Sequence, residues 1–368
     1  MHPLNALLFG WLMGYALKRR NGADPLGPWR WVAGGAGALF AYSECVIGLV
    51  DKGVAAEAYR SLTWSLVLLP FYAFLLAGLV GAVSRKGWSA VFTPVVAGLL
   101  SAWVLAVLTE TGVAPFAMLV NWRLALGVLN HFDLILAGLC VAGLALVLAV
   151  PRFNRDLARV AAAAVAVYVG YAGYCAYEAR SFGEHYAETM GLKDAVVEAV
   201  PQPLSPTNWR VVVEDGGHLH DTMVNLRRKT VKVAGDKALK IARVEALYRP
   251  LDKAVWRVYS RFGPSDLSAP SRRRVHGAWQ AWQDTPYGWY GRYAVFDGFV
   301  GVPQVGAGIA CVVFMDLRYD GMAHAERGTY VICPGEGGRA RVFRPSGPAK
   351  GVGQWPGFYE LVPLAGTR

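Results

Sequence analysis

The sequence predicts an α-helical membrane bundle of about six spans, residues 1–180, followed by a small α+β soluble domain, residues 181–368. The mean hydropathy is +0.30, and only 17% of the residues are charged, whereas soluble proteins contain about 25%. Long apolar runs fill the chain up to residue 180, and charges reach an ordinary frequency after it. The first half is therefore the candidate membrane part.

Six apolar runs are candidates for membrane helices, because a bilayer core needs roughly 20 apolar residues per helix. They cover residues 4–17, 30–50, 61–83, 88–109, 131–150 and 158–177. The stretch 112–130 is also apolar, but Pro115, Asn121 and Arg123 interrupt it. We expect an interfacial or re-entrant loop there.

Basic residues gather in the odd-numbered loops between these runs, for example at Arg85-Lys86 and at Arg152 and Arg155. The positive-inside rule makes those loops cytoplasmic. We therefore expect a multi-pass protein of a bacterial inner membrane, with the lipid bilayer as its partner and the C-terminal domain in the periplasm. The sequence contains no basic run with interleaved aromatic residues, so nucleic acid is not an expected partner.

The soluble half contains two hairpin signals. Residues 208–214 and 218–226 flank the turn Asp215-Gly216-Gly217, and residues 308–319 and 328–333 form the second pair, with a further strand at 340–343. Residues 237–262 and 271–283 are helix-like. Cys311 and Cys333 lie on the second hairpin, and the sequence leaves open whether they form a disulfide.

Several short motifs, in order, resemble the YdjM-like membrane-bound metal-dependent hydrolases. Residues 1–10 (MHPLNALLFG) are similar to the family's M-D-P-x-T-H-A-x-x-G, residues 59–65 (YRSLTWS) to H-R-G-x-T-H-S, and residues 101–112 to S-H-x-x-x-D-x-x-T-S-Y-G. After the apolar runs, residues 203–212 (PLSPTNWRVV) resemble P-x-x-P-x-x-W-R-V-V, and residues 315–319 (MDLRY) a late D-L-R-F strand.

The resemblance implies a divalent metal ion held by His and Asp side chains, but most of those ligands are replaced here. The degenerate site comprises Asn5, Ala6, Tyr42, Glu44, Tyr59, Arg60, Trp64, Ala102 and Ala106. In it Glu44 is the one remaining usual ligand, and Arg60 is a candidate structural partner for it. One carboxylate does not hold a zinc or manganese ion, which needs three or four ligands.

Three functions follow as hypotheses. The first is a catalytically inactive, hydrolase-like accessory or scaffold subunit without a cofactor, with other membrane-protein subunits as possible partners. The alternative is an active hydrolase of a lipid-linked or phosphoester substrate. It would carry a relocated zinc or manganese site built from Glu44, Glu110, His131 or Asp133. A small transporter is the third hypothesis, although the sequence contains no inverted repeat that supports it.

Overall fold

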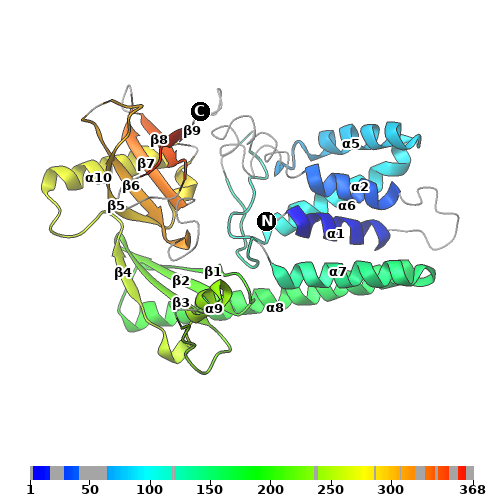
Figure 1. The fold of residues 1–368 in the computed structure, drawn as a ribbon, viewed down its shortest axis with the longest axis horizontal. Coiled ribbons are helices and arrows are strands. Elements are labelled where there is room, and N and C mark those ends of the chain that lie inside the picture. The colour runs from blue at the N-terminus through cyan, green and yellow to red at the C-terminus, as the bar shows by residue number, and fades with distance from the viewer. Residues whose placement is uncertain are drawn as a thin grey trace.

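The first half of the chain forms a bundle of helices, and the second half forms two antiparallel sheets (Figure 1). The computed structural model describes residues 3–16, 29–40, 64–117, 119, 122–131, 133–235, 239–285, 287–306, 308–319, 328–335, 339–347 and 355–361. Those residues form eight α-helices and nine β-strands.

Glycines allow the helix backbones of the bundle to touch. The bundle comprises α1 (Pro3–Ala16), α2 (Trp29–Phe40), α5 (Leu69–Ser84), α6 (Trp88–Val107), α7 (Leu134–Ala149) and α8 (Asn154–Thr189). A Cβ atom added at Gly98 of α6 would lie 2.1 Å from the carbonyl oxygen of Gly34 on α2, and one added at Gly34 would lie 2.6 Å from that of Gly10 on α1. Such close approach of small residues is typical of membrane helices.

The expectation of about six membrane spans is wrong. Among the described residues, two helices have the length and hydropathy to cross a bilayer, Trp88–Val107 and Pro151–Thr189. The other four apolar helices have 14, 12, 16 and 16 residues. At a rise of 1.5 Å per residue, the longest of these is about 24 Å long, shorter than the roughly 30 Å bilayer core. Residues 41–50 and 61–63 of two predicted spans lie outside the described residues.

The prediction of a loop at residues 112–130 is confirmed for the residues that the structure describes. Residues 108–130 fold back over the end of α6 without helical structure among those described. Val113 and Leu124 exchange two backbone hydrogen bonds of 3.0 and 2.8 Å, and Leu126 N–H donates to the carbonyl of Val107 at 2.8 Å. These bonds satisfy backbone groups that a helix would otherwise pair internally.

Helix α8 belongs to both halves of the chain. It has 36 residues, and the domain boundary predicted at residue 180 falls inside it. Its first part packs on α1 and α7, with Val165 and Ala172 in their common core. Its last part packs on the first sheet, where Ala179 shares a core with Trp209 and Val211.

The first sheet confirms the predicted first hairpin. Its order is β1-β2-β3-β4, all antiparallel, with β1 (Val196–Pro201), β2 (Asn208–Asp215), β3 (His218–Asn225) and β4 (Arg257–Ser260). Gly216 and Gly217 turn the chain with φ of 53° and 87°, conformations that glycine adopts without strain. The helix-like pattern over 237–262 was only partly correct, because α9 (Lys240–Ala246) is followed by a strand.

The second half contains a second antiparallel sheet, whereas the sequence predicted one small α+β domain there. This sheet has the order β5-β6-β7-β8-β9. Its strands are β5 (Ala294–Gly301), β6 (Ala310–Asp316), β7 (Thr329–Pro334), β8 (Ala340–Pro345) and β9 (Phe358–Leu361), and α10 (Ala269–Gln283) covers one face. Strands β6 and β7 pair as expected from the second hairpin signal.

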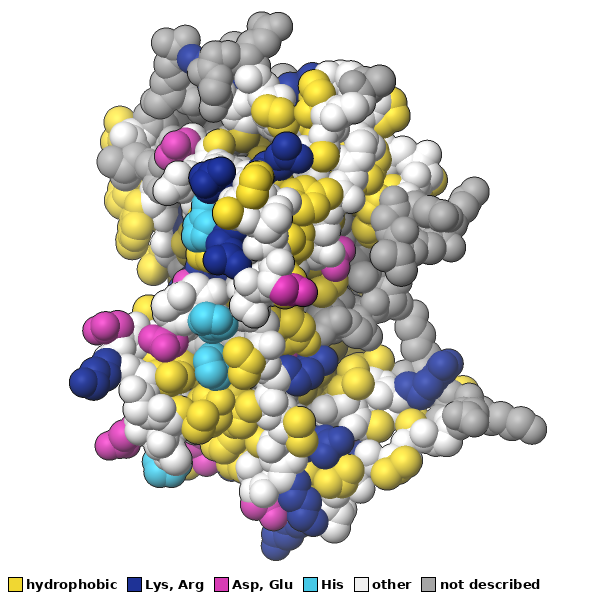
Figure 2. Space-filling view, turned by 90° about the vertical axis from the view of Figure 1, so that its left-hand side faces the viewer, with side chains coloured by type: hydrophobic (Ala, Val, Ile, Leu, Met, Phe, Trp, Pro, Cys, Tyr) yellow, Lys and Arg dark blue, Asp and Glu magenta, His cyan; other side chains and the backbone are white. Residues whose placement is uncertain are grey.

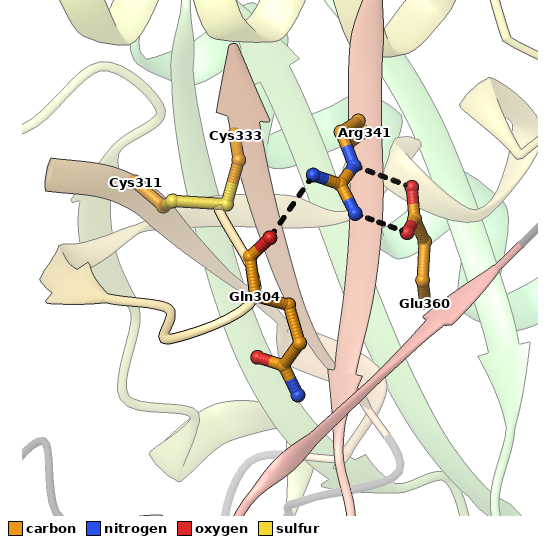
Figure 3. The surroundings of a disulfide bond; sticks show 5 residues. All are labelled: Gln304, Cys311, Cys333, Arg341 and Glu360. Atoms are coloured by element: carbon orange, nitrogen blue, oxygen red, sulfur yellow. Dashed lines mark hydrogen bonds and ion pairs between the residues drawn. A yellow bond between two sulfur atoms is a disulfide. The ribbon is translucent and has the colours of Figure 1, made fainter. Parts of the chain in front are cut away.

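A disulfide joins Cys311 on β6 to Cys333 on β7, which answers the question left open by the sequence (Figure 3). The two Cα atoms are 4.5 Å apart, as in a directly opposed pair of antiparallel residues. Nearby, Arg341 on β8 donates to both carboxylate oxygens of Glu360 on β9 at 2.7 and 2.5 Å, and to the carbonyl of Gln304 at 3.3 Å.

Candidate functional site

The described part of the predicted site is a closed apolar cluster. Ala6 of α1, Trp64, and Ala102 and Ala106 of α6 lie in one core, with exposed fractions of 3% for Trp64 and 0% for the three alanines. Tyr42, Glu44, Tyr59 and Arg60 lie outside the described residues. The structure thus brings together four positions that are far apart in sequence and that the resemblance assigns to one site.

Hydrogen bonds fix the backbone around Trp64 against α6 and the loop after it. The carbonyl of Trp64 accepts from Nε1 of Trp103 at 2.9 Å. Next to it, Ser65 Oγ donates to the carbonyl of Pro115 at 3.1 Å, and Leu66 N–H donates to the same carbonyl at 2.9 Å. The chain that carries Trp64 is therefore held on both α6 and the loop that follows it.

Asn5 lies beside this cluster and connects it to α7. Its side chain is fully buried, and Nδ2 donates to the backbone carbonyl of Asp133 at 3.1 Å. Asp133 caps α7, because Oδ1 accepts from the backbone N–H of Leu136 at 2.8 Å. Its Oδ2 accepts from the hydroxyl of Tyr168 on α8 at 2.6 Å. Both carboxylate oxygens of Asp133 thus serve helix packing.

The relocated metal site of the alternative hypothesis is not assembled by the described residues. Glu110, His131 and Asp133 are half-buried near the same end of the bundle. No three His, Cys, Asp or Glu side chains in the described part of the chain are close enough together to hold a metal ion. Glu44, the fourth candidate, is not among those residues.

A buried ion pair lies within the first sheet, and its arginine also bonds to the chain that follows β6 of the second sheet. This contact brings together both motifs that resembled the family in the soluble half. Arg210 and Asp221 are fully buried neighbours on β2 and β3. Arg210 Nε donates to Asp221 Oδ1 at 2.7 Å and Nη2 to Oδ2 at 3.2 Å. Arg210 Nη1 also donates to the carbonyl of Leu317, directly after β6. The W-R-V-V and D-L-R segments therefore meet where the sheets meet.

A second polar cluster lies at the same junction. Glu198 on β1 forms an ion pair with Arg292 and accepts from the hydroxyl of Tyr293. Burial raises the pKa of Tyr293, although the nearby charges of Arg292 and Arg318 oppose the shift. Tyr293 also shares an apolar core with Val200 and Val212 of the first sheet and Val295 of the second, so the two sheets meet at Tyr293.

A cavity of about 460 Å³ lies between α10 and the second sheet, and sequence reasoning missed it. Gly277, Ala278 and Ala281 of α10 and the edge of β6 and β7 line it, and Arg274 and Arg339 are at its rim. The only signal for it in the sequence was the spacing of small residues along 271–283. Its volume falls in the range of small-molecule sites, but no catalytic pair of side chains lines it.

Comparison with protein-family models, with curated proteins and with solved structures found no match. The chemistry open to the described residues is therefore judged from geometry alone. The side chains of Ala6, Trp64, Ala102 and Ala106 offer no ligand atoms to a cation.

Proposed function

We propose that this chain is a membrane-embedded, catalytically inactive relative of YdjM-like hydrolases that acts as an accessory or scaffold subunit. The observation that carries the proposal is the apolar cluster of Ala6, Trp64, Ala102 and Ala106. Methyl groups and an indole occupy positions where the resemblance implies imidazoles and carboxylates, and a divalent ion needs such electron-pair donors.

The outer surface of the long helices supports the membrane location. On α8, Val160 and Val167 are 68% and 74% exposed, and Leu100 and Val104 of α6 are also exposed. Large apolar side chains facing outward from helices long enough to cross a bilayer are stabilised by lipid rather than by water. The disulfide supports a location of the two sheets in an oxidising compartment such as the periplasm.

The proposal is tested by metal analysis of the full chain, purified from membranes without chelator. We expect less than stoichiometric zinc and manganese, and no change on Glu44→Ala. Stoichiometric metal that Glu44→Ala removes would instead favour the alternative, an active hydrolase with a relocated site.

The accessory role is tested by the native size of the protein extracted in mild detergent. We expect an assembly larger than the single chain, and a native size equal to that of the single chain would contradict the role.

A further inference from the structure

One segment outside the bundle combines positive charge with exposed apolar side chains. Residues 227–235 and 239–247, called here the basic–apolar segment, contain six Lys or Arg residues and one acidic residue. Val233 and Leu239 are 89% and 77% exposed, and Val231, Ile241 and Leu247 are exposed as well. Water solvates such valine and leucine side chains poorly, so the segment is suited to a surface that is both apolar and negatively charged.

The start of this segment is fixed at the level where α8 leaves the apolar part of the bundle. Arg227 forms an ion pair with Glu178 of α8, and its guanidinium lies 5.8 Å from the ring centre of Tyr174. Tyr171, Tyr174 and Tyr177 are exposed and follow each other at three-residue spacing, so they share one side of the helix. Exposed tyrosines above lipid-facing valines are typical of the membrane–water interface.

Internal ion pairs shape the segment and leave part of its charge available. Glu245 of α9 forms ion pairs with Arg228 at 2.6 Å and with Lys232 at 3.3 Å. These pairs hold α9 against the residues that follow β3. Burial opposes ionisation of Glu245, but hydrogen bonds from Asn208 and Lys232 and the charge of Arg228 outweigh it and lower its pKa. Lys229 and Arg243 are exposed and have no acidic partner among the described residues.

Figure 2 shows the end of the molecule that is turned away from the bundle, where acidic, basic and apolar side chains are interspersed. The basic–apolar segment combines the exposed Lys229 and Arg243 with exposed apolar side chains, and its start adjoins Tyr174 of α8.

We infer that the basic–apolar segment is an interfacial anchor that binds the anionic phospholipid headgroups of the membrane in which the bundle sits. Lys229 and Arg243 contact headgroup phosphates, while Val233, Leu239 and Ile241 enter the boundary between headgroups and acyl chains. Basic residues near an anionic leaflet and apolar insertion add to each other. The inference rests on the proposed membrane location and adds a lipid class and a site of contact to it.

The experiment places one fluorophore on the full chain in nanodiscs that contain lipids with a quencher near the headgroup. A Val233→Cys variant is labelled with NBD in a background whose cysteines outside the disulfide are alanine. Val167→Cys on α8 is the lipid-facing reference, and Gln280→Cys on α10 is the water-facing reference. We expect strong quenching at position 233 with phosphatidylglycerol, and at least twofold less with phosphatidylcholine alone.

Charge reversal provides the second measurement. Lys229→Glu with Arg243→Glu should at least halve the phosphatidylglycerol-dependent quenching at position 233. Arg273→Glu with Arg274→Glu on α10 changes the net charge equally and should leave the quenching unaltered. Equal effects of the two pairs, or equal quenching in both lipids, would overturn the inference.

The references separate this inference from the proposed function. If position 167 is quenched while 233 behaves like 280, the segment is not an anchor but the membrane location stands. If position 167 is itself unquenched, the membrane location fails and the anchor fails with it.

Discussion

Removal of the Asp221 carboxylate should destabilise the two sheets strongly. Asp221 is fully buried and accepts two hydrogen bonds from the equally buried Arg210. In Asp221→Ala the guanidinium of Arg210 remains buried without a counter-charge, and breaking a buried ion pair in this way costs about 3–5 kcal/mol. With an m-value of about 2 kcal/mol/M, the urea midpoint should fall by roughly 2 M.

The assay is urea unfolding of the full chain in detergent, followed by tryptophan fluorescence. Trp209 adjoins Arg210 and is fully buried, so its emission should shift to longer wavelength when the sheets open. Arg257→Ala is the control, because Arg257 donates to the same carboxylate but its side chain is 46% exposed. Exposed pairs contribute less than about 1 kcal/mol.

A double replacement tests the physical reason separately. Arg210→Met with Asp221→Leu removes both charges, and well-packed apolar residues should restore most of the stability that Asp221→Ala loses. If Asp221→Ala lies within about 1 kcal/mol of the unmodified chain, as expected for an ordinary hydrogen bond, the claim that this buried ion pair stabilises the fold strongly is refuted.

Three further outcomes are expected. Gly183→Ala should weaken the packing of α8 on the first sheet by about 1–3 kcal/mol, because its Cβ would lie 2.5 Å from a methyl of Val197. Gly170→Ala is the control, because a Cβ there meets nothing within 4 Å, and it should be neutral or stabilising in the same urea titration. Burial and the charge of His218 lower the pKa of His220, so the neutral form is favoured in the folded state. The contribution of His220 to stability should be complete above the unfolded pKa of about 6.5 and should be lost as the pH drops from 7 to 5. His220→Gln should flatten this pH dependence, while His185→Gln at an exposed site should leave it unchanged. Replacement of Cys311 and Cys333 by alanine removes the disulfide that joins residues 22 positions apart, and it should lower the free energy of unfolding by about 2–4 kcal/mol. Reductant should lower the thermal midpoint of the unmodified chain and leave that of the variant unchanged.

Local signals in the sequence predicted the sheet hairpins well. The glycine pair at 216–217 and the alternation on either side of it specify a hairpin without reference to the rest of the chain. The helix length of α10 was also close to its prediction. The strand Arg257–Ser260 was missed because its pairing with β3 depends on a partner more than thirty residues away, and that information is absent from a local window.

The polar interruptions Pro115, Asn121 and Arg123 correctly predicted that the apolar stretch after α6 is not a helix in its described part. The start of α5 was predicted less well, because the apolar run begins at residue 61 and the helix begins at Leu69. The convergence of Ala6, Trp64, Ala102 and Ala106 was predictable because motif order placed them at neighbouring helix ends. The role of Asp133 as a helix cap and partner of Tyr168 was not, since it depends on three helices meeting.

The continuity of α8 has a mechanical consequence. Its 36 residues form a helix of roughly 54 Å at 1.5 Å per residue. One end packs against α1 and α7, and the other end packs against the strands around Trp209. The helix continues without a break between those two contacts, so a tilt of α8 at one end displaces the first sheet at the other. The buried hydrogen bond from Arg210 to Leu317 would pass that displacement on to the second sheet, so the two sheets and the helix should move together.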